Sequence, residues 1–153
     1  MNHTEKAREL FLSGCNCAQA VFTAFSDVTG FDEETALKLS SSFGAGMGRM
    51  REVCGACSGM FMVCGMLYGY ADVNDSKLKA EHYALIQKMA EQFKEQHNTV
   101  VCRELLAGLK TDTSPVPEAR TEAYYKTRPC LKFVETAARI MDSIIAEKGL
   151  EIR

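Results

Sequence analysis

The sequence predicts an all-α protein, a compact bundle of about six to eight helices around one central helix rich in glycine and cysteine. Apolar residues recur at spacings of three and four along most of the chain, which is typical of amphipathic helices. No segment shows the sustained two-residue alternation of a half-buried strand. With 153 residues, 46% of them hydrophobic, the chain has the size and composition of one domain, so a single domain over 1–153 is expected.

In the N-terminal third, residues 2–25 carry a helical apolar pattern that Gly14 divides into two helices. The acidic run 32–34 supplies the first turn of another helix through Leu39, because negative charge suits the positive N-terminal end of a helix. The three glycines within 44–48 then predict a flexible loop.

The middle of the chain is predicted to hold the central helix and the longest one. Residues 54–70 are almost entirely apolar and contain several glycines that allow close packing, so we expect a buried helix. Asp75 or Ser76 caps an amphipathic helix that runs to about His97.

Beyond this helix, 102–106 predicts a short helix and 110–118, with two prolines, an exposed loop. The last helix follows Pro129, which suits a first-turn position, and continues to about Gly149.

Charge and hydropathy exclude several partners. The formal net charge of −2 and the isoelectric point near 5.9 offer no basic surface for nucleic acid or anionic lipid. Residues 1–8 lack the apolar core of a secretory signal, and the glycine-punctuated stretch 53–70 is marginal in length for a membrane span. We therefore expect a cytoplasmic protein without a membrane span.

The cysteines carry the first functional signal. Their number, seven, is odd, and in a reducing compartment clustered thiols indicate metal binding or redox chemistry more often than structural disulfides. Four lie near predicted helix starts, where the helix dipole and free amides stabilise a thiolate: Cys17, Cys54, Cys102 and Cys130. The last three also have arginines nearby in sequence, which would lower their pKa if the side chains met: Arg49 and Arg51, Arg103, and Arg128.

Cys54 and Cys57 form a CxxC motif, which is typical of dithiol exchange with Cys54 attacking and Cys57 resolving. No strand precedes the motif, so a thioredoxin fold is not expected, although dithiol chemistry needs no particular fold. Helical spacing places both cysteines and Cys64 on one face of the central helix. Cys64 by itself is expected to be a small buried apolar residue.

Other cofactors fit the sequence less well. Zinc favours paired CxxC modules or added histidines, whereas this chain has one CxxC and three scattered histidines, His3, His82 and His97. No CxxCH motif for haem attachment is present. The glycine loop 44–48 lacks the preceding strand and the Lys-Ser/Thr ending of a nucleotide-binding loop. We interpret it as a close backbone approach to the central cysteines, with amides free to donate hydrogen bonds to a sulfur or an anionic ligand.

Four ordered motifs resemble the redox-active family named for its cysteine pattern, the C-GCAxxG-C-C proteins. The first family cysteine resembles Cys17 within 16–21 (NCAQAV), and the glycine-rich approach is similar to 43–50. The CGAxxG core matches 54–59 (CGACSG), and the third and fourth cysteines resemble Cys102 and Cys130. The resemblance covers nearly the whole chain.

The resemblance implies a small helical redox protein, often encoded near transporters, and a related domain of a c-type cytochrome has been linked to an iron-sulfur site. We therefore expect Cys17, Cys54, Cys102 and Cys130 to converge, as ligands of an iron-sulfur cluster or as exchanging thiols. This chain departs from the family by adding Cys15, Cys57 and Cys64. The sequence leaves open whether the protein is instead a metal-binding or sensory module without turnover. It also leaves open a transporter-linked role, an unidentified redox partner and a homo-oligomer.

Overall fold

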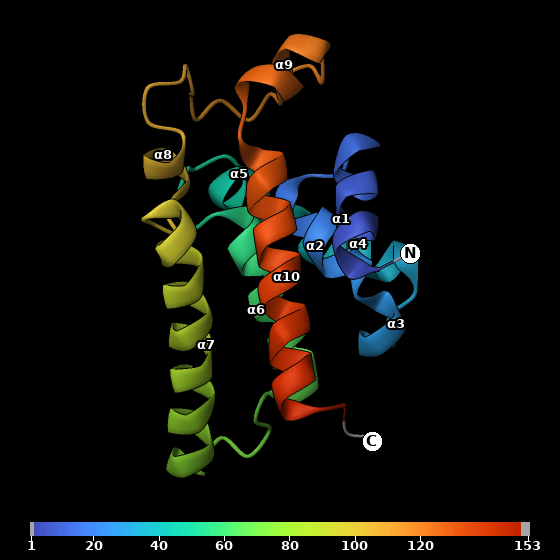
Figure 1. The fold of residues 1–153 in the computed structure, drawn as a ribbon, viewed down its shortest axis with the longest axis vertical. Helices are drawn as coiled ribbons and strands as arrows, with labels where there is room; N and C mark the ends of the chain where they lie inside the picture. Colours follow the sequence, from blue (N-terminus) through green and yellow to red (C-terminus); the bar gives the residue numbers. More distant parts are fainter. Residues whose placement is uncertain (1, 151–153) are drawn as a thin grey trace.

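The computed structural model describes residues 2–150, which form ten α-helices and one 3-10 helix and contain no strand (Figure 1). The all-α prediction is confirmed. The seven α-helices predicted from the sequence are all present, and the remaining three α-helices, each of six residues or fewer, were not predicted. The elements are α1 His3–Leu12, α2 Cys17–Ala24, α3 Ser26–Thr29, α4 Glu33–Ser40, η1 Ser41–Phe43, α5 Gly44–Met47, α6 Gly55–Tyr68, α7 Ser76–His97, α8 Cys102–Leu105, α9 Glu122–Thr127 and α10 Cys130–Lys148.

The glycine- and cysteine-rich α6 lies at the centre, packed against α2, α7 and α10. Its glycines permit this packing, because a Cβ atom on Gly59 would lie 2.9 Å from Cβ of Val21. A Cβ atom on Gly55 would lie 3.2 Å from Cβ of Cys17 and 3.0 Å from the Ala18 amide nitrogen. The backbones of α2 and α6 therefore approach more closely than they could if α6 carried side chains at these two positions.

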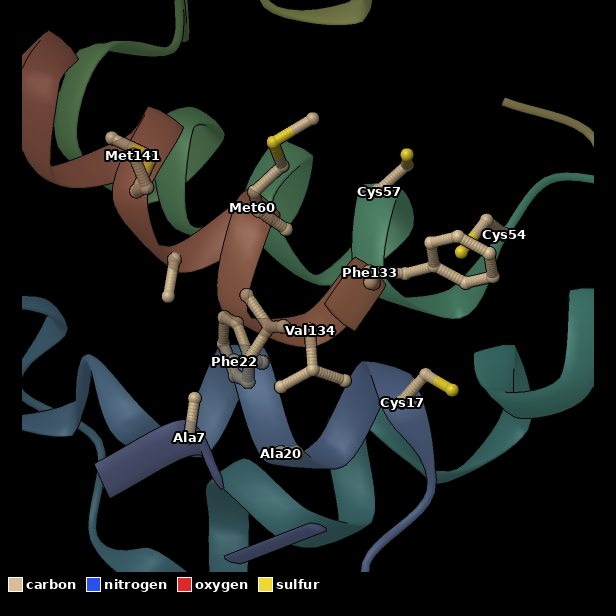
Figure 2. Close-up of a cluster of buried hydrophobic side chains, with 14 of the residues drawn as sticks. Ala7, Cys17, Ala20, Phe22, Cys54, Cys57, Met60, Phe133, Val134 and Met141 are labelled. Atoms are coloured by element: carbon tan, nitrogen blue, oxygen red, sulfur yellow. The ribbon is translucent and has the colours of Figure 1, made fainter. Parts of the chain in front are cut away.

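One core joins α1, α2, α6 and α10, and the long α7 contributes only Met89 and Phe93 as fully buried residues (Figure 2). Phe22 of α2, Met60 of α6 and Val134 of α10 meet in this core. Burial of such side chains stabilises the bundle by about 1.5–3 kcal/mol each.

The helix starts follow local capping rules. The Asn16 side chain accepts a hydrogen bond from the Gln19 amide, and the Gln19 side chain accepts one from the Asn16 amide, which is a capping box that begins α2 at Cys17. The Asp75 carboxylate accepts from the Leu78 amide and begins α7, as the sequence predicts.

The predicted flexible loop over 44–48 is instead an ordered left-handed turn. Ala45, Gly46, Met47, Gly48 and Arg49 have φ angles of +53°, +72°, +67°, +57° and +68°. This conformation costs roughly 1–2 kcal/mol for each residue other than glycine. A hydrogen bond of 2.9 Å from the Glu52 amide to the Gly46 carbonyl closes the turn. Sequence periodicity misses it because a single turn has no repeat to detect.

Two further short helices, α3 and α9, were also not expected, for the same reason. Among residues 2–150, no helix is long and apolar enough to cross a bilayer.

Candidate redox centre at four helix starts

The side chains of Cys17, Cys54, Cys102 and Cys130 line one pocket of about 260 Å³. Cys17, Cys102 and Cys130 are the first residues of α2, α8 and α10, and Cys54 is the N-cap of α6. The prediction that these four lie at helix starts is confirmed. Free amides and the positive ends of four helices consequently meet at one pocket, an arrangement that by itself stabilises thiolate. Hydrogen bonding and burial work against this effect at Cys17, and burial does so at Cys102, so the pKa values of both thiols are raised.

A backbone link brings two of these cysteines together. An isolated antiparallel bridge joins Val53 to Val101, the residues that precede Cys54 and Cys102. The Cys54 amide donates to the Val100 carbonyl at 2.7 Å, and the Cys102 amide donates to the Glu52 carbonyl at 2.6 Å. Residues 48 positions apart in sequence therefore start their helices side by side.

The left-handed turn forms one wall of the pocket. A Cβ atom on Gly46 would lie 2.6 Å from the Arg51 Cα atom and 2.7 Å from Cβ of Cys102, so only glycine fits there. Arg49 and Arg51 both have positive φ, and both side chains are buried and line the pocket. Strained backbone of this kind is common at functional sites, where the surrounding structure holds it in place.

Arg51 is the arginine that reaches a cysteine sulfur. Its Nη1 atom lies 3.9 Å from Sγ of Cys102, and its Nε donates to the Asp112 carbonyl at 3.0 Å. Its Nη2 atom is buried without a hydrogen-bond partner and lies 3.6 Å from a carboxylate oxygen of Glu118. This guanidinium is therefore held between a sulfur and a carboxylate.

Tyr124 and two more arginines complete the wall. The guanidinium groups of Arg120 and Arg128 lie 5.0 Å and 5.4 Å from the centre of the Tyr124 ring. Burial raises the pKa of Tyr124 to about 12, so its hydroxyl stays protonated at neutral pH. The pocket thus holds a neutral phenol among cationic groups.

The Cys54 and Cys57 thiols have opposite pKa shifts. The Cys57 thiol acts as a hydrogen-bond donor and, with the amides of Cys57 and Ala56, lowers the pKa of Cys54. Burial raises the pKa of Cys57. Cys54 is therefore the more nucleophilic member of the CxxC motif.

The Cys17 and Cys130 thiols show the same division. The Cys17 thiol, as a hydrogen-bond donor, lowers the pKa of Cys130, and the charges of Arg128, Arg120 and Arg51 lower it further. That same hydrogen bond, together with burial, raises the pKa of Cys17. Burial also raises the pKa of Cys102, and Arg51 opposes this effect.

The family comparison agrees with this geometry. A family model described as "Putative redox-active protein (C_GCAxxG_C_C)" matches residues 15–144, a span that includes all seven cysteines. The chain belongs to the C_GCAxxG_C_C family. Neither the curated proteins nor the solved structures yielded a match. The resemblance expected from the four motifs is thereby confirmed.

The three cysteines that this C_GCAxxG_C_C protein adds do not line the pocket. Cys57 is fully buried behind Cys54, and Figure 2 shows its sulfur directed away from Cys17. Cys64 lies two turns farther along α6, where burial raises its pKa to about 11. Cys15 is half-buried. The roles of Cys54 as attacking thiol and Cys57 as resolving thiol stay predictions.

The donor set of the pocket suits an all-thiolate centre, because four cysteines from four helix starts can each offer one sulfur. Within residues 2–150, however, no three or more His, Cys, Asp or Glu side chains are placed to hold a metal ion. A metal centre at this site therefore requires the cysteine side chains to turn toward it.

The histidines of this C_GCAxxG_C_C protein lie elsewhere. His3 contacts Asp142 at 2.6 Å and Asp27 at 2.9 Å, and His97 contacts the Thr136 hydroxyl at 2.9 Å. His82 lines a separate pocket beside Tyr70. All three are half-buried, and none lines the cysteine pocket.

Sequence reasoning missed several residues of the site. Arg103 follows Cys102 in sequence, but its side chain is exposed and pairs with Glu52. Arg51 lies beside the Cys102 sulfur instead, and Arg120, Tyr124 and Glu118 come from segments to which no role was given. No local signal could have found them, because their relation to the cysteines depends on how distant segments pack.

Proposed function

We propose that this protein transfers electrons through an iron-sulfur cluster held by Cys17, Cys54, Cys102 and Cys130. The observation that carries the proposal is the convergence of these four thiols, from four helix starts, on one arginine-lined pocket. All-thiolate sets of this kind are the usual ligands of such clusters. A bound cluster would supply one-electron transfer chemistry.

The charge of the pocket supports this proposal. Among residues 2–150, four arginines line it, Arg49, Arg51, Arg120 and Arg128, and two carboxylates pair with them, those of Glu118 and Asp112. Within this part of the chain the arginines thus exceed the carboxylates by two positive charges. They offset the negative charge that thiolate ligands bring into a buried site, which lowers the cost of burying that charge.

The chain's own groups would then set the reduction potential. Arg51 is placed to donate to the Cys102 sulfur, and the amides of Ala56 and Cys57 donate to the Cys54 sulfur. Hydrogen bonds and positive charge near cluster sulfurs stabilise the more negative, reduced state and raise the potential.

Anaerobic purification followed by visible spectroscopy and iron and sulfide analysis tests the proposal. We expect a coloured protein with stoichiometric iron and sulfide, lost in Cys17→Ser, Cys54→Ser, Cys102→Ser and Cys130→Ser. Cys15→Ser and Cys64→Ser serve as controls that keep it. A protein that stays colourless and free of iron and sulfide after reconstitution would reject the cluster, and stoichiometric zinc instead would favour a binding module without turnover.

A second candidate function is thiol-disulfide exchange. It is favoured by the opposite pKa shifts of the two thiols in each of two pairs, Cys54 with Cys57 and Cys17 with Cys130. A Cys54 thiolate would attack a substrate disulfide and release one thiolate. Cys57, losing its proton, would then attack the mixed disulfide and release the second thiol. The protein dithiol is oxidised by two electrons and the substrate disulfide is reduced by two.

Equilibration with buffers of reduced and oxidised dithiothreitol, followed by mass spectrometry, tests this second function. We expect one reversible disulfide between Cys54 and Cys57, abolished by Cys57→Ala and kept by Cys64→Ala. Thiols that all stay reduced across the whole range of buffers would contradict this second function.

The proposal further includes a cytoplasmic location and an unidentified redox partner, whereas a transporter-linked role and a homo-oligomer stay predictions.

A further inference from the structure

Residues 110–120 form a strap that covers the cysteine pocket. The strap has no helix or strand, runs between α8 and α9 beside the start of α10, and is mostly exposed (Figure 1). It nevertheless contributes Pro115, Pro117, Glu118 and Arg120 to the pocket lining. Access to the sulfurs therefore depends on where this segment lies.

Three arginines from the body of the protein converge on one carboxylate of the strap. An oxygen of Glu118 lies 2.8 Å from Nη2 of Arg128, 3.3 Å from Nη2 of Arg49 and 3.6 Å from Nη2 of Arg51. All three arginine side chains are at most 10% exposed, whereas the Glu118 side chain is 33% exposed. The carboxylate is thus inserted from the outside into a buried cationic cluster.

The rest of the strap is held by side chains rather than by backbone pairing. Arg49 donates to the Val116 carbonyl and pairs with Asp112, and Arg51 donates to the Asp112 carbonyl. Within the described chain, no backbone-to-backbone hydrogen bond ties residues 110–118 to another element.

The two ends of the strap have anchors of their own. Arg128 donates to the Lys110 carbonyl at 3.1 Å, and Arg120 donates to the Phe11 and Cys15 carbonyls at 3.1 Å and 2.9 Å. Removing the charged contacts of Glu118 and Asp112 would therefore free the middle of the strap.

The same arginines also face the sulfurs. Arg51 contacts Cys102 through Nη1 while Nη2 faces Glu118, and the positive charge of Arg128 acts on Cys130. Two of the guanidinium groups that hold Glu118 therefore also face the pocket sulfurs.

We propose that Glu118 is a latch, which holds the strap of residues 110–120 closed over the cysteine pocket through the buried guanidinium groups of Arg49, Arg51 and Arg128. This inference rests on the proposed function in one respect, that the cysteine pocket is the functional site. It applies both to a cluster and to thiol-disulfide exchange. In the closed state the strap limits which reactants reach Cys54, Cys102 and Cys130. In the open state larger partners gain access.

Thiol labelling of the reduced, metal-free full chain tests the latch. Two reagents are compared, iodoacetamide as a small probe and a maleimide carrying a polyethylene glycol chain as a bulky probe, with mass spectrometry to assign the labelled cysteines. In Glu118→Gln we expect labelling of the pocket cysteines by the bulky probe to accelerate about tenfold, since the charged contacts of Glu118 with three arginines are weakened; a tenfold change corresponds to about 1.4 kcal/mol. The gain for iodoacetamide should be smaller, because a small probe needs less opening.

Glu122→Gln is the matched control, because Glu122 lies close by in α9 but pairs only with Lys126 on the surface. Its labelling should equal that of the unaltered protein. Hydrogen-deuterium exchange of 110–120 should accelerate in Glu118→Gln and less in Asp112→Asn, which loses only the carboxylate contact with Arg49. The latch would be overturned if a folded Glu118→Gln protein had the same rates of bulky-probe labelling and of hydrogen-deuterium exchange as the unaltered protein.

The outcome is separable from that of the cluster proposal. Labelling uses metal-free protein, so the absence of a cluster leaves the latch test intact. Equally, an unchanged labelling rate says nothing against iron and sulfide found in the purified protein.

Discussion

Nη1 of Arg51 lies 3.9 Å from Sγ of Cys102, although the two residues are 51 positions apart in sequence. The contact exists because Arg51 lies next to the left-handed turn, with a φ of +61°, and because the Val53–Val101 bridge places Cys102 opposite it. It joins the strained backbone, the cysteine pocket and the strap, since the other nitrogen of the same guanidinium faces Glu118.

Replacing Arg51 should change the reactivity of Cys102. In Arg51→Gln the positive charge that opposes the effect of burial is gone, so the pKa of Cys102 should rise further and the midpoint of its alkylation rate against pH should move to higher pH. Arg51→Lys keeps the charge and should move this midpoint less. Loss of the buried ion pair should also reduce the free energy of unfolding by about 1–3 kcal/mol. Equal midpoints in Arg51→Gln, Arg51→Lys and the unaltered protein would contradict the assigned role.

The paired thiols should titrate on opposite sides of the ordinary thiol pKa of 9.0. The lowered pKa of Cys130 means that its thiolate persists to lower pH, so its alkylation should reach half of its maximum rate below pH 9.0. The raised pKa of Cys17 should move its own midpoint above pH 9.0. Rates measured by mass spectrometry from pH 6 to pH 11 check this, and Cys130→Ala should remove the hydrogen-bonding cause of the shift at Cys17.

Gly46→Ala should damage the site and the fold together. The added Cβ would lie 2.6 Å from a backbone atom of Arg51 and 2.7 Å from Cβ of Cys102, in a residue with a φ of +72°. We expect the free energy of unfolding to fall by about 1–3 kcal/mol, measured by urea denaturation.

Gly65→Ala is the control for this substitution, because nothing lies within 4 Å of its added Cβ and the residue is inside α6. We expect a neutral effect or a gain of about 0.5–1 kcal/mol. If the Gly46→Ala protein were as stable as the Gly65→Ala protein, the left-handed turn would be able to accommodate a side chain at position 46, contrary to this prediction.

Cys64 should contribute to packing and not to redox chemistry. The side chain is fully buried in the core and does not line the pocket. Cys64→Ala should therefore reduce the free energy of unfolding by about 1 kcal/mol through the small cavity it leaves. Iron content and the disulfide equilibrium should match those of the unaltered protein, and a change in either would place Cys64 in the working set.

Local patterns in the sequence determined the helices and the positions of the four pocket cysteines along them. Capping residues such as Asn16 and Asp75 act within one turn, so the starts of α2 and α7 follow from neighbouring residues alone. The glycine spacing of α6 likewise predicted a central, closely packed helix. Single turns such as α3 and α5 escaped prediction because a pattern needs at least two repeats.

The tertiary structure alone decided which groups surround those sulfurs. Arg51 rather than Arg103 reaches Cys102, Glu118 gathers three arginines, and Cys57 turns away from the pocket that Cys54 lines. These relations depend on a left-handed backbone that directs side chains against local preference and on contacts between residues about 50 to 70 positions apart. Neither effect leaves a signal in neighbouring residues, so the sequence could name the four cysteines but not the charged cluster and the strap that enclose them.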